Sequence, residues 1–168
     1  MNLPDAESLV AKLAEQIRRD AGPAVALVGI YTGGVWIAER LHRMLGLGTP
    51  IGTIDVAFYR DDYKRTGLRP EVRPSDIPFK VEDADIILVD DVLYTGRTIR
   101  AALNEIFDYG RPSSIRLAAL IDRGGRQLPI CPQFVATTMQ VAPEQTIELR
   151  QEAGRFSLAL MSRGAREA

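Results

Sequence analysis

One stretch of the chain, residues 86–98, restricts the fold more than any other. It opens with four consecutive large apolar residues, 86–89, three of them β-branched, which is the composition of a strand buried on both faces. Two adjacent carboxylates, Asp90 and Asp91, follow where we expect that strand to leave the core. Residues 95–98 then combine two hydroxyls, a glycine and a cation, and apolar residues recur behind them at helical spacing. The stretch therefore predicts a buried strand, a short loop and an amphipathic helix.

The predicted loop lies at the carboxyl end of a parallel strand, where open α/β sheets bind their ligands. Backbone N–H groups of the loop and of the helix N-terminus would face an anion there, with the hydroxyls of Thr95 and Thr98 as further donors. Asp90 and Asp91 suit the hydroxyls of a sugar, or Mg²⁺ held mainly by water and ligand phosphates. Together these groups predict a site for a phosphorylated ribose. The alternative interpretation is a buried strand followed by a solvated Asp-Asp turn and an ordinary helix cap.

Apolar patterns along the rest of the chain predict a single α/β domain. Strands alternate with helices, which favours a central parallel sheet flanked by helices. No internal repeat or interdomain linker interrupts the pattern. The predicted elements are a helix at 5–20, buried strands at 25–30 and 115–121, a helix that begins near 35, strands at 51–59 and 134–136, and a hairpin of 147–149 with 156–160 that turns at Gly154.

A second glycine-containing turn, residues 31–34, follows the buried strand at 25–30 and leads into a helix. Thr32, Gly33 and Gly34 thus repeat the local geometry of the first loop and would offer backbone amides to a second phosphate group. The turn is not a Walker P-loop, because it lacks Gly-Lys-Ser/Thr, and its glycines do not have the spacing of a dinucleotide fingerprint. Taken alone, such a turn is more often a tight packing turn than a ligand site.

Residues 60–78 form a long segment without periodicity that is rich in charges of both signs. A structureless loop of this length inside a compact domain is usually functional or disordered. We interpret it as a lid whose cations close over a polyphosphate and exclude water. The alternative is a mobile excursion of mixed charge.

Composition narrows the class of protein. With 168 residues, of which 46% are hydrophobic, the chain is long enough for one domain with a full core, and its net charge of −1 means that any polyanion site must be a local patch. Cys131 cannot form an intramolecular disulfide and is expected to be a packed small residue, while the sole histidine, His42, is expected to be structural or solvent-exposed. The chain has no apolar run of membrane-spanning length and no signal peptide, so we expect a cytoplasmic protein.

The string Val-Asp-Asp-Val-Leu-Tyr-Thr-Gly-Arg-Thr at 89–98 resembles the phosphoribosyl-diphosphate (PRPP) signature of type I phosphoribosyltransferases. Three further segments, 59–62, 108–115 and 121–124, support the resemblance, which runs over most of residues 25–130. It implies the type I phosphoribosyltransferase fold, a central parallel sheet flanked by helices with a small hood from the chain ends. The implied division is one domain, 1–168, with a core at about 23–135, a hood from about 1–22 and 136–168, and the lid at about 60–78.

The resemblance also implies a reaction, in which uracil and PRPP give UMP and pyrophosphate, with Mg²⁺ held through PRPP. Asp90 and Asp91 would grip the ribose hydroxyls, and Arg60 would contact the pyrophosphate. Loop groups near 122–126 and 137–141 would decide which base binds, so a phosphoribosyltransferase for a purine base is the alternative. The implied contacts of PRPP or UMP are Thr32, Gly33, Gly34, Asp90, Asp91, Val92, Leu93, Tyr94, Thr95, Gly96, Arg97 and Thr98, and the implied neighbours of the nucleobase are Asp122 and Arg123.

Within the family, the likeness is to members that also regulate pyrimidine genes by sensing UMP and binding a leader RNA. A homodimer or higher homo-oligomer is expected, which would enlarge any basic surface. Tyr31 and Gly33 stand where those members usually carry Lys and Arg, so pyrophosphate contacts in this turn would rest on backbone amides. The cations that the resemblance places on the RNA-binding surface are Lys12, Arg18, Arg19 and Arg126.

Overall fold

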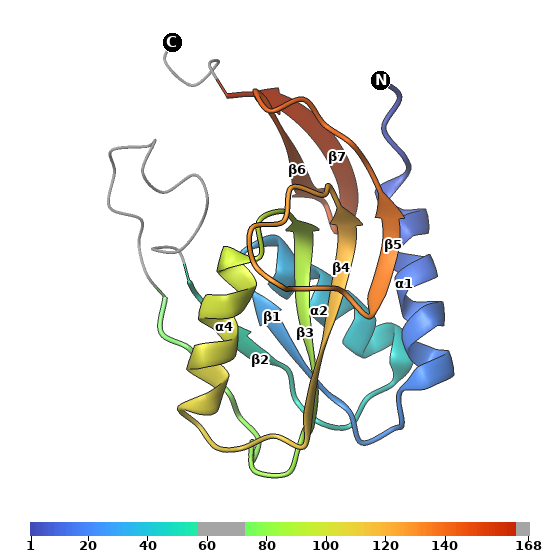
Figure 1. Ribbon diagram of the computed structural model, residues 1–168. Coiled ribbons are helices and arrows are strands. Elements are labelled where there is room, and N and C mark those ends of the chain that lie inside the picture. Colours follow the sequence, from blue (N-terminus) through green and yellow to red (C-terminus); the bar gives the residue numbers. More distant parts are fainter. Residues whose placement is uncertain (57–72, 164–168) are drawn as a thin grey trace.

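A computed structural model of the chain describes residues 1–56 and 73–163 (Figure 1). Its elements are α1 (Ala6–Asp20), β1 (Ala26–Ile30), α2 (Gly33–Leu45), β2 (Gly52–Ile54), β3 (Asp85–Leu93), α4 (Arg97–Phe107), β4 (Ser114–Asp122), β5 (Phe134–Thr138), β6 (Gln145–Glu152) and β7 (Arg155–Ser162). Five strands pair in parallel in the order β2-β1-β3-β4-β5, and β6 and β7 form a separate antiparallel hairpin. The structure therefore has the parallel sheet that the apolar patterns predict.

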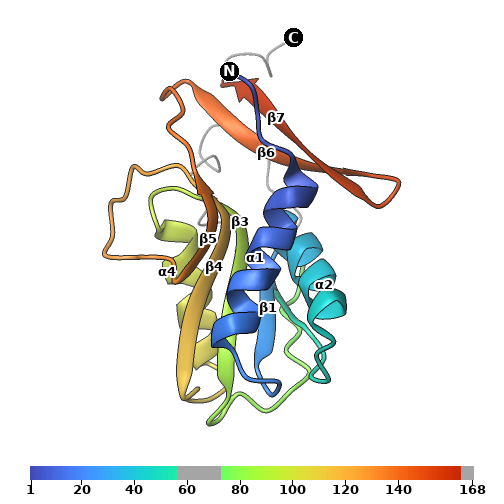
Figure 2. The same cartoon turned by 90° about the vertical axis from the view of Figure 1, so that its right-hand side faces the viewer.

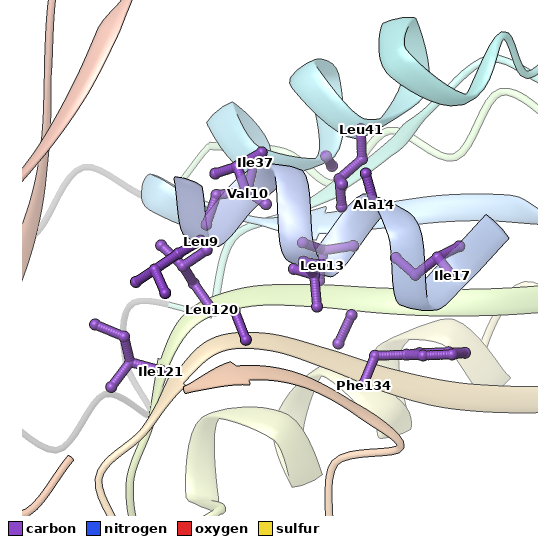
Figure 3. Close-up of a cluster of buried hydrophobic side chains, with 14 of the residues drawn as sticks. Leu9, Val10, Leu13, Ala14, Ile17, Ile37, Leu41, Leu120, Ile121 and Phe134 are labelled. Atoms are coloured by element: carbon purple, nitrogen blue, oxygen red, sulfur yellow. The ribbon is translucent and has the colours of Figure 1, made fainter. Parts of the chain in front are cut away.

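Helices cover both faces of this sheet, α1 and α2 on one side and α4 on the other (Figures 1 and 2). Figure 3 shows the cluster on the first side, to which Leu13 of α1, Leu41 of α2 and Phe134 of β5 all belong. Ile99 and Ile106 of α4 belong to a second cluster, which fills the opposite face. Burying each such side chain contributes about 1.5–3 kcal/mol, so the helical stripes read from the sequence hold the sheet from both sides.

Strand β3 continues past its apolar run, because its backbone stays paired with β4 as far as Leu93, which lies opposite Asp122. We expect the strand to leave the core at the two carboxylates, whereas in the structure Asp90 is still buried and only Asp91 is half-buried. Asp90 and Asp91 lie within the strand, and pairing with β4 keeps the backbone extended around them. The loop that follows is correspondingly short, since α4 already begins at Arg97.

The hairpin β6–β7 stands over the carboxyl edge of the sheet (Figures 1 and 2). Glu7 of α1 and Arg40 of α2 fasten it there. Glu7 accepts the N–H of Phe156 at 2.7 Å and pairs with Arg40 at 2.5 Å, while Arg40 donates to the carbonyl of Gly154 at 2.6 Å. The hydrogen bond from Phe156 lowers the pKa of Glu7 below its usual value. The predicted hairpin, with its turn at Gly154, is thus confirmed.

Helix α1 occupies most of the N-terminal segment that is expected to belong to the hood. It lies along the sheet and packs against β5 and α2, and it also contacts the hairpin strand β7. Its apolar stripe is buried because it completes the core on that face, and the first turn reaches the hairpin through Glu7. Strand β5 carries the sheet on to Thr138, beyond the expected boundary at 136.

The expected lid lies largely outside the described residues, and so does Arg60. Residues 73–78 are described, and Asp76 there forms an antiparallel bridge with Thr53 of β2. The strand expected at 51–59 is a three-residue strand in the described part of the chain, because β2 ends at Ile54.

Two isolated residues have different outcomes. The Nε2 atom of His42 lies 2.8 Å from the carbonyl oxygen of Thr49, an internal contact that agrees with the structural role expected for this residue. Cys131 is exposed, so the expectation that it packs in the interior is wrong. No helix in residues 1–56 or 73–163 is long and apolar enough to cross a membrane.

Candidate functional site

Three strand ends meet at the carboxyl edge of the sheet. Strand β3 lies between β1 and β4, with Gly29 opposite Val89 on one side and Leu93 opposite Asp122 on the other. The turns after β1, β3 and β4 are therefore neighbours, although they are far apart in the sequence. This topology brings together the predicted site residues of all three turns.

The two carboxylates of β3 are held by main-chain hydrogen bonds. The Oδ1 atom of Asp90 accepts the N–H of Asp91 at 2.9 Å, and Oδ1 of Asp91 accepts the N–H of Val92 at 2.8 Å. Asp90 is buried, and Asp91 is half-buried. Asp91 faces the turn before α2, since a Cβ atom at Gly33 would overlap its carboxylate. The protein itself therefore fixes the orientation of both carboxylates.

The turn between β3 and α4 has the features of an anion site. Gly96 is the N-cap residue of α4, with a φ of 93°, a left-handed conformation that favours glycine, and it has no side chain that could cap the helix. The Oγ1 atom of buried Thr95 accepts the N–H of Arg97 at 3.3 Å, and the Arg97 side chain is exposed. The turn is braced from behind, because the carbonyl of Thr95 accepts the N–H groups of Gln127 and Leu128 at 2.9 and 3.2 Å. The helix N-terminus is therefore open and rigid, as phosphate binding requires.

The turn between β1 and α2 is more tightly packed. Gly33 and Gly34 are both buried, and a Cβ atom at Gly34 would overlap the carbonyl oxygen of Val89. The peptide bond between Tyr31 and Thr32 is cis. Like α4, helix α2 has no side-chain cap, since Thr32 makes no capping hydrogen bond. The backbone of this turn thus approaches β3 closely, as a chain with side chains at these two positions could not.

The turn after β4 is built around two arginines. Arg123 is 8% exposed, with its guanidinium 4.0 Å from the centroid of the Tyr94 ring and its Nη1 donating to the carbonyl of Gln145 at 3.1 Å. Asp122 pairs with Arg126 at 2.6 Å and accepts the N–H of Gly124 at 2.9 Å. Arg126, a candidate for the RNA-binding surface, donates through its guanidinium nitrogens to acceptors inside the protein.

A cavity of about 510 Å³ opens beside this turn. Its lining joins the ends of β3, β4 and β5 and includes both predicted neighbours of the nucleobase, Asp122 and Arg123. Sequence reasoning located the loops near 122–126 and 137–141 but missed the part played by the ring of Tyr94 and by Pro143. The lining residues are Tyr94, Asp122, Arg123, Gly124, Gly125, Thr138, Met139, Gln140, Val141 and Pro143.

The carboxylate oxygens of Asp90 and Asp91 suit a magnesium ion that takes its other ligands from outside the protein. Carboxylate oxygens are the donors that Mg²⁺ prefers, and it usually takes only one or two of them from a protein. Within the described ranges, no group of three or more His, Cys, Asp or Glu side chains could hold a metal by itself. Asp90 and Asp91 therefore fit an ion whose remaining ligands are water and the phosphates of a substrate.

Comparison with known proteins defines the class. The profile of the phosphoribosyl transferase domain matches residues 2–147. Among solved structures, a hypoxanthine-guanine phosphoribosyltransferase from Bacillus anthracis aligns with a TM-score of 0.68 at 22% identity, covering 88% of this chain and 86% of that one. A purine phosphoribosyltransferase from Pyrococcus horikoshii aligns with a TM-score of 0.62 at 26% identity, covering 80% and 83%. The chain therefore has the fold of a phosphoribosyltransferase domain.

Curated relatives narrow the class further. The bifunctional protein PyrR of Nitrosococcus oceani is 53% identical over 86% of this chain and 80% of the relative. The bifunctional protein PyrR of Pseudomonas aeruginosa strain PAO1 is 47% identical over 89% of this chain and 90% of the relative. This chain belongs to the PyrR family of phosphoribosyltransferases.

Proposed function

We propose that this protein is a uracil phosphoribosyltransferase, which converts uracil and PRPP to UMP and pyrophosphate and senses UMP as a regulator of pyrimidine biosynthesis. One observation carries the proposal. The carboxylates of Asp90 and Asp91, the open N-terminus of α4 and the cavity after β4 lie side by side at one edge of the sheet. These would be receptors for a ribose, a 5′-phosphate and a base, which are the three parts of UMP.

The chemistry needs positioning and charge more than reactive side chains. Breaking the anomeric C–O bond of PRPP leaves positive charge on the sugar and a multiply charged leaving group. Asp90 and Asp91 would hold the ribose hydroxyls, and their negative charge would stabilise the sugar as it becomes cationic. Mg²⁺, when bound, would neutralise charge on the pyrophosphate. The fixed orientation of both carboxylates means that little rearrangement is needed on binding.

The 5′-phosphate would bind at the turn after β3. The hydroxyls of Thr95 and Thr98 and the N–H groups at the start of α4 would donate to it, with Arg97 as the nearby cation. The pyrophosphate would face the turn of Thr32, Gly33 and Gly34 through backbone amides. Arg60, our further candidate for a pyrophosphate contact, lies outside the described residues.

The base would occupy the cavity beside Asp122 and Arg123. Both side chains already have partners in the protein, Arg126 for Asp122 and the Tyr94 ring for Arg123. We therefore assign them to shaping the pocket wall, and place recognition of the base in the loop that begins at Thr138. Such a pocket selects by which polar groups it leaves paired or unpaired when the base binds.

A PRPP-dependent assay with uracil, hypoxanthine, guanine, adenine and orotate tests the proposal. We expect uracil to be converted with the highest kcat/KM and the release of pyrophosphate to require Mg²⁺. Conversion of hypoxanthine or guanine with uracil left unreacted would overturn the uracil assignment in favour of a purine enzyme. Failure of all five bases to react would overturn the enzymatic assignment.

Binding of a leader RNA is a second candidate, favoured by the name bifunctional that the relatives carry. Lys12, Arg18 and Arg19 are exposed on α1, but Arg18 and Arg19 both lie beside Glu15, at 3.3 and 3.4 Å. We propose that these three residues, doubled in a cytoplasmic homo-oligomer, contact RNA phosphates. Salt-dependent binding of a pyrimidine-operon leader RNA, strengthened by UMP, would support this function. Binding that UMP leaves unchanged at low salt would refute it.

A further inference from the structure

The side chain of Arg126 connects three segments of the site. Its Nη1 donates to the carbonyl of Tyr94 at 2.6 Å, its Nη2 to Oδ2 of Asp122 at 2.6 Å, and its Nε to the carbonyl of Ile130 at 2.8 Å. The side chain is 22% exposed. A planar guanidinium presents donors in a fixed fork, so three simultaneous bonds fix the relative positions of the three acceptors.

Each of these acceptors belongs to a residue beside the phosphate turn or in the wall of the base cavity. Tyr94 directly precedes the phosphate turn, and its ring lines the base cavity. Asp122 ends β4 and lines the same cavity. Ile130 lies against the phosphate turn, since a Cβ atom at Gly96 would stand 3.0 Å from the Ile130 side chain. Arg126 therefore sits between the phosphate half and the base half of the site.

Main-chain hydrogen bonds also join the same two halves. Arg123 donates its N–H to the carbonyl of Leu93 at 3.0 Å, and Gln127 donates its N–H to the carbonyl of Thr95 at 2.9 Å. Arg126 adds side-chain hydrogen bonds to the Tyr94 carbonyl and to Oδ2 of Asp122, whose Oδ1 accepts the N–H of Gly124. Arg126 therefore binds a lining residue of the cavity at each of the two strand ends.

We propose that Arg126 is a positioning residue that aligns the phosphate turn with the base cavity, so that one ligand can occupy both at once. The inference rests on the proposed function, because UMP is the ligand that spans the two halves. Arg126 touches neither half of the ligand itself; it acts through Tyr94 and Asp122. A ligand that fills only the phosphate half depends little on this alignment.

Equilibrium binding of UMP and of ribose 5-phosphate to Arg126→Met and Arg126→Lys tests the proposal. We expect the Kd for UMP to rise by about tenfold or more while the Kd for ribose 5-phosphate changes by less than about threefold. Lysine retains the charge but not the three-way fork, so it should fail to restore UMP binding. Arg100→Met, on the exposed side of α4, is the matched control and should change neither constant.

Thermal unfolding of each variant accompanies the titrations, and if Arg126→Met does not fold, Arg126→Lys carries the test. Equal weakening of both ligands, or unchanged UMP binding, would overturn the positioning role. The proposed function fails separately, by an absence of UMP binding to the unsubstituted protein.

Discussion

The turn before α2 and the turn before α4 have similar positions in the fold, but they need glycine for different reasons. Each follows a buried parallel strand, and neither helix has a side-chain cap. In the first turn, Gly33 and Gly34 are buried because Asp91 and the carbonyl of Val89 occupy the space where side chains would stand. In the second, Gly96 is needed for its φ of 93°, and it is followed by the exposed cation Arg97.

The difference shows that glycine serves two physical purposes at one site. In the α2 turn it provides space, so that the backbone itself can approach β3. In the α4 turn it provides a left-handed conformation directly before the helix N-terminus, which is the proposed site of the 5′-phosphate. Affinity for the 5′-phosphate should therefore depend on side chains, whereas the α2 turn should depend on how closely the backbone packs.

The largest expected effect is at the carboxylate that faces the α2 turn. Asp91→Asn keeps the shape of the side chain but removes its charge, so stabilisation of the cationic sugar is lost. We expect kcat to fall by about 10²–10³-fold with an unchanged circular dichroism spectrum. Steady-state kinetics with uracil and PRPP measure this. Asp90→Asn should behave in the same way, and full turnover in either variant would refute the assigned roles.

The second-largest effect on activity is expected when the packing of the turn before α2 is disturbed. Gly33→Ala introduces a methyl group that overlaps the Asp91 carboxylate, so either the turn or the carboxylate must move. Displacement of a reacting group by about 1 Å costs about 10²-fold in rate, and we expect kcat/KM to fall by that order. The matched control is Gly48→Ala, because a Cβ atom there meets open space. Equal activity of the two variants would show that close packing of this turn is unimportant.

A smaller and different effect is expected in the α4 turn. Thr98→Val removes one hydroxyl and keeps the β-branched shape. If that hydroxyl donates to the 5′-phosphate, its loss should raise the KM for PRPP by about tenfold, while kcat changes little. An effect on kcat alone would place Thr98 outside the phosphate site and would remove the contrast between the turns.

The smallest effect is expected at α1, the helix whose N-terminus is capped by the side chain of Asp5. The Oδ2 atom of Asp5 accepts the N–H of Ser8 at 3.0 Å and its hydroxyl at 2.7 Å, and the hydroxyl contact in particular lowers the pKa of Asp5 below its usual value. Asp5→Ala should therefore lower the urea midpoint at pH 7 and leave kcat unchanged.

Acid should remove this difference. Because the pKa of Asp5 is lower in the folded chain than its usual value, the contribution of the carboxylate is complete above that usual value and is lost as the pH falls through the folded value. Urea midpoints measured from pH 7 downward should converge for the two proteins below about pH 4. Asp20→Ala, at the other end of α1, should not lower the midpoint at pH 7, because a negative charge there opposes the helix dipole.

Local patterns of apolar residues were sufficient to predict much of the fold. The apolar run at 86–89, the stripe of α1 and the alternation in the hairpin each define an element by its own residues. The end of β3 could not be read in this way, because its extension through Asp90 and Asp91 comes from pairing with β4. The place of α1 along the sheet likewise follows from tertiary packing against β5.

The residues of the site likewise fall into those that local sequence predicts and those that only tertiary contacts bring into place. The motif at 89–98 predicted which residues gather at the strand end, since motif and strand–helix context are local. The role of Arg126 is not local: its partners Tyr94 and Ile130 lie on either side of it in the sequence and meet only in the folded chain. A single cation in a polar turn looks the same in sequence whether it faces solvent or connects two loops.

A crystal structure of the protein with UMP tests the central claim most directly. We predict the 5′-phosphate at the hydroxyls and N–H groups of residues 95–98, the ribose hydroxyls at Asp90 and Asp91, and the uracil ring in the cavity after β4. UMP bound elsewhere, with residues 90–98 free of ligand, would contradict the assignment of this strand end as the nucleotide site.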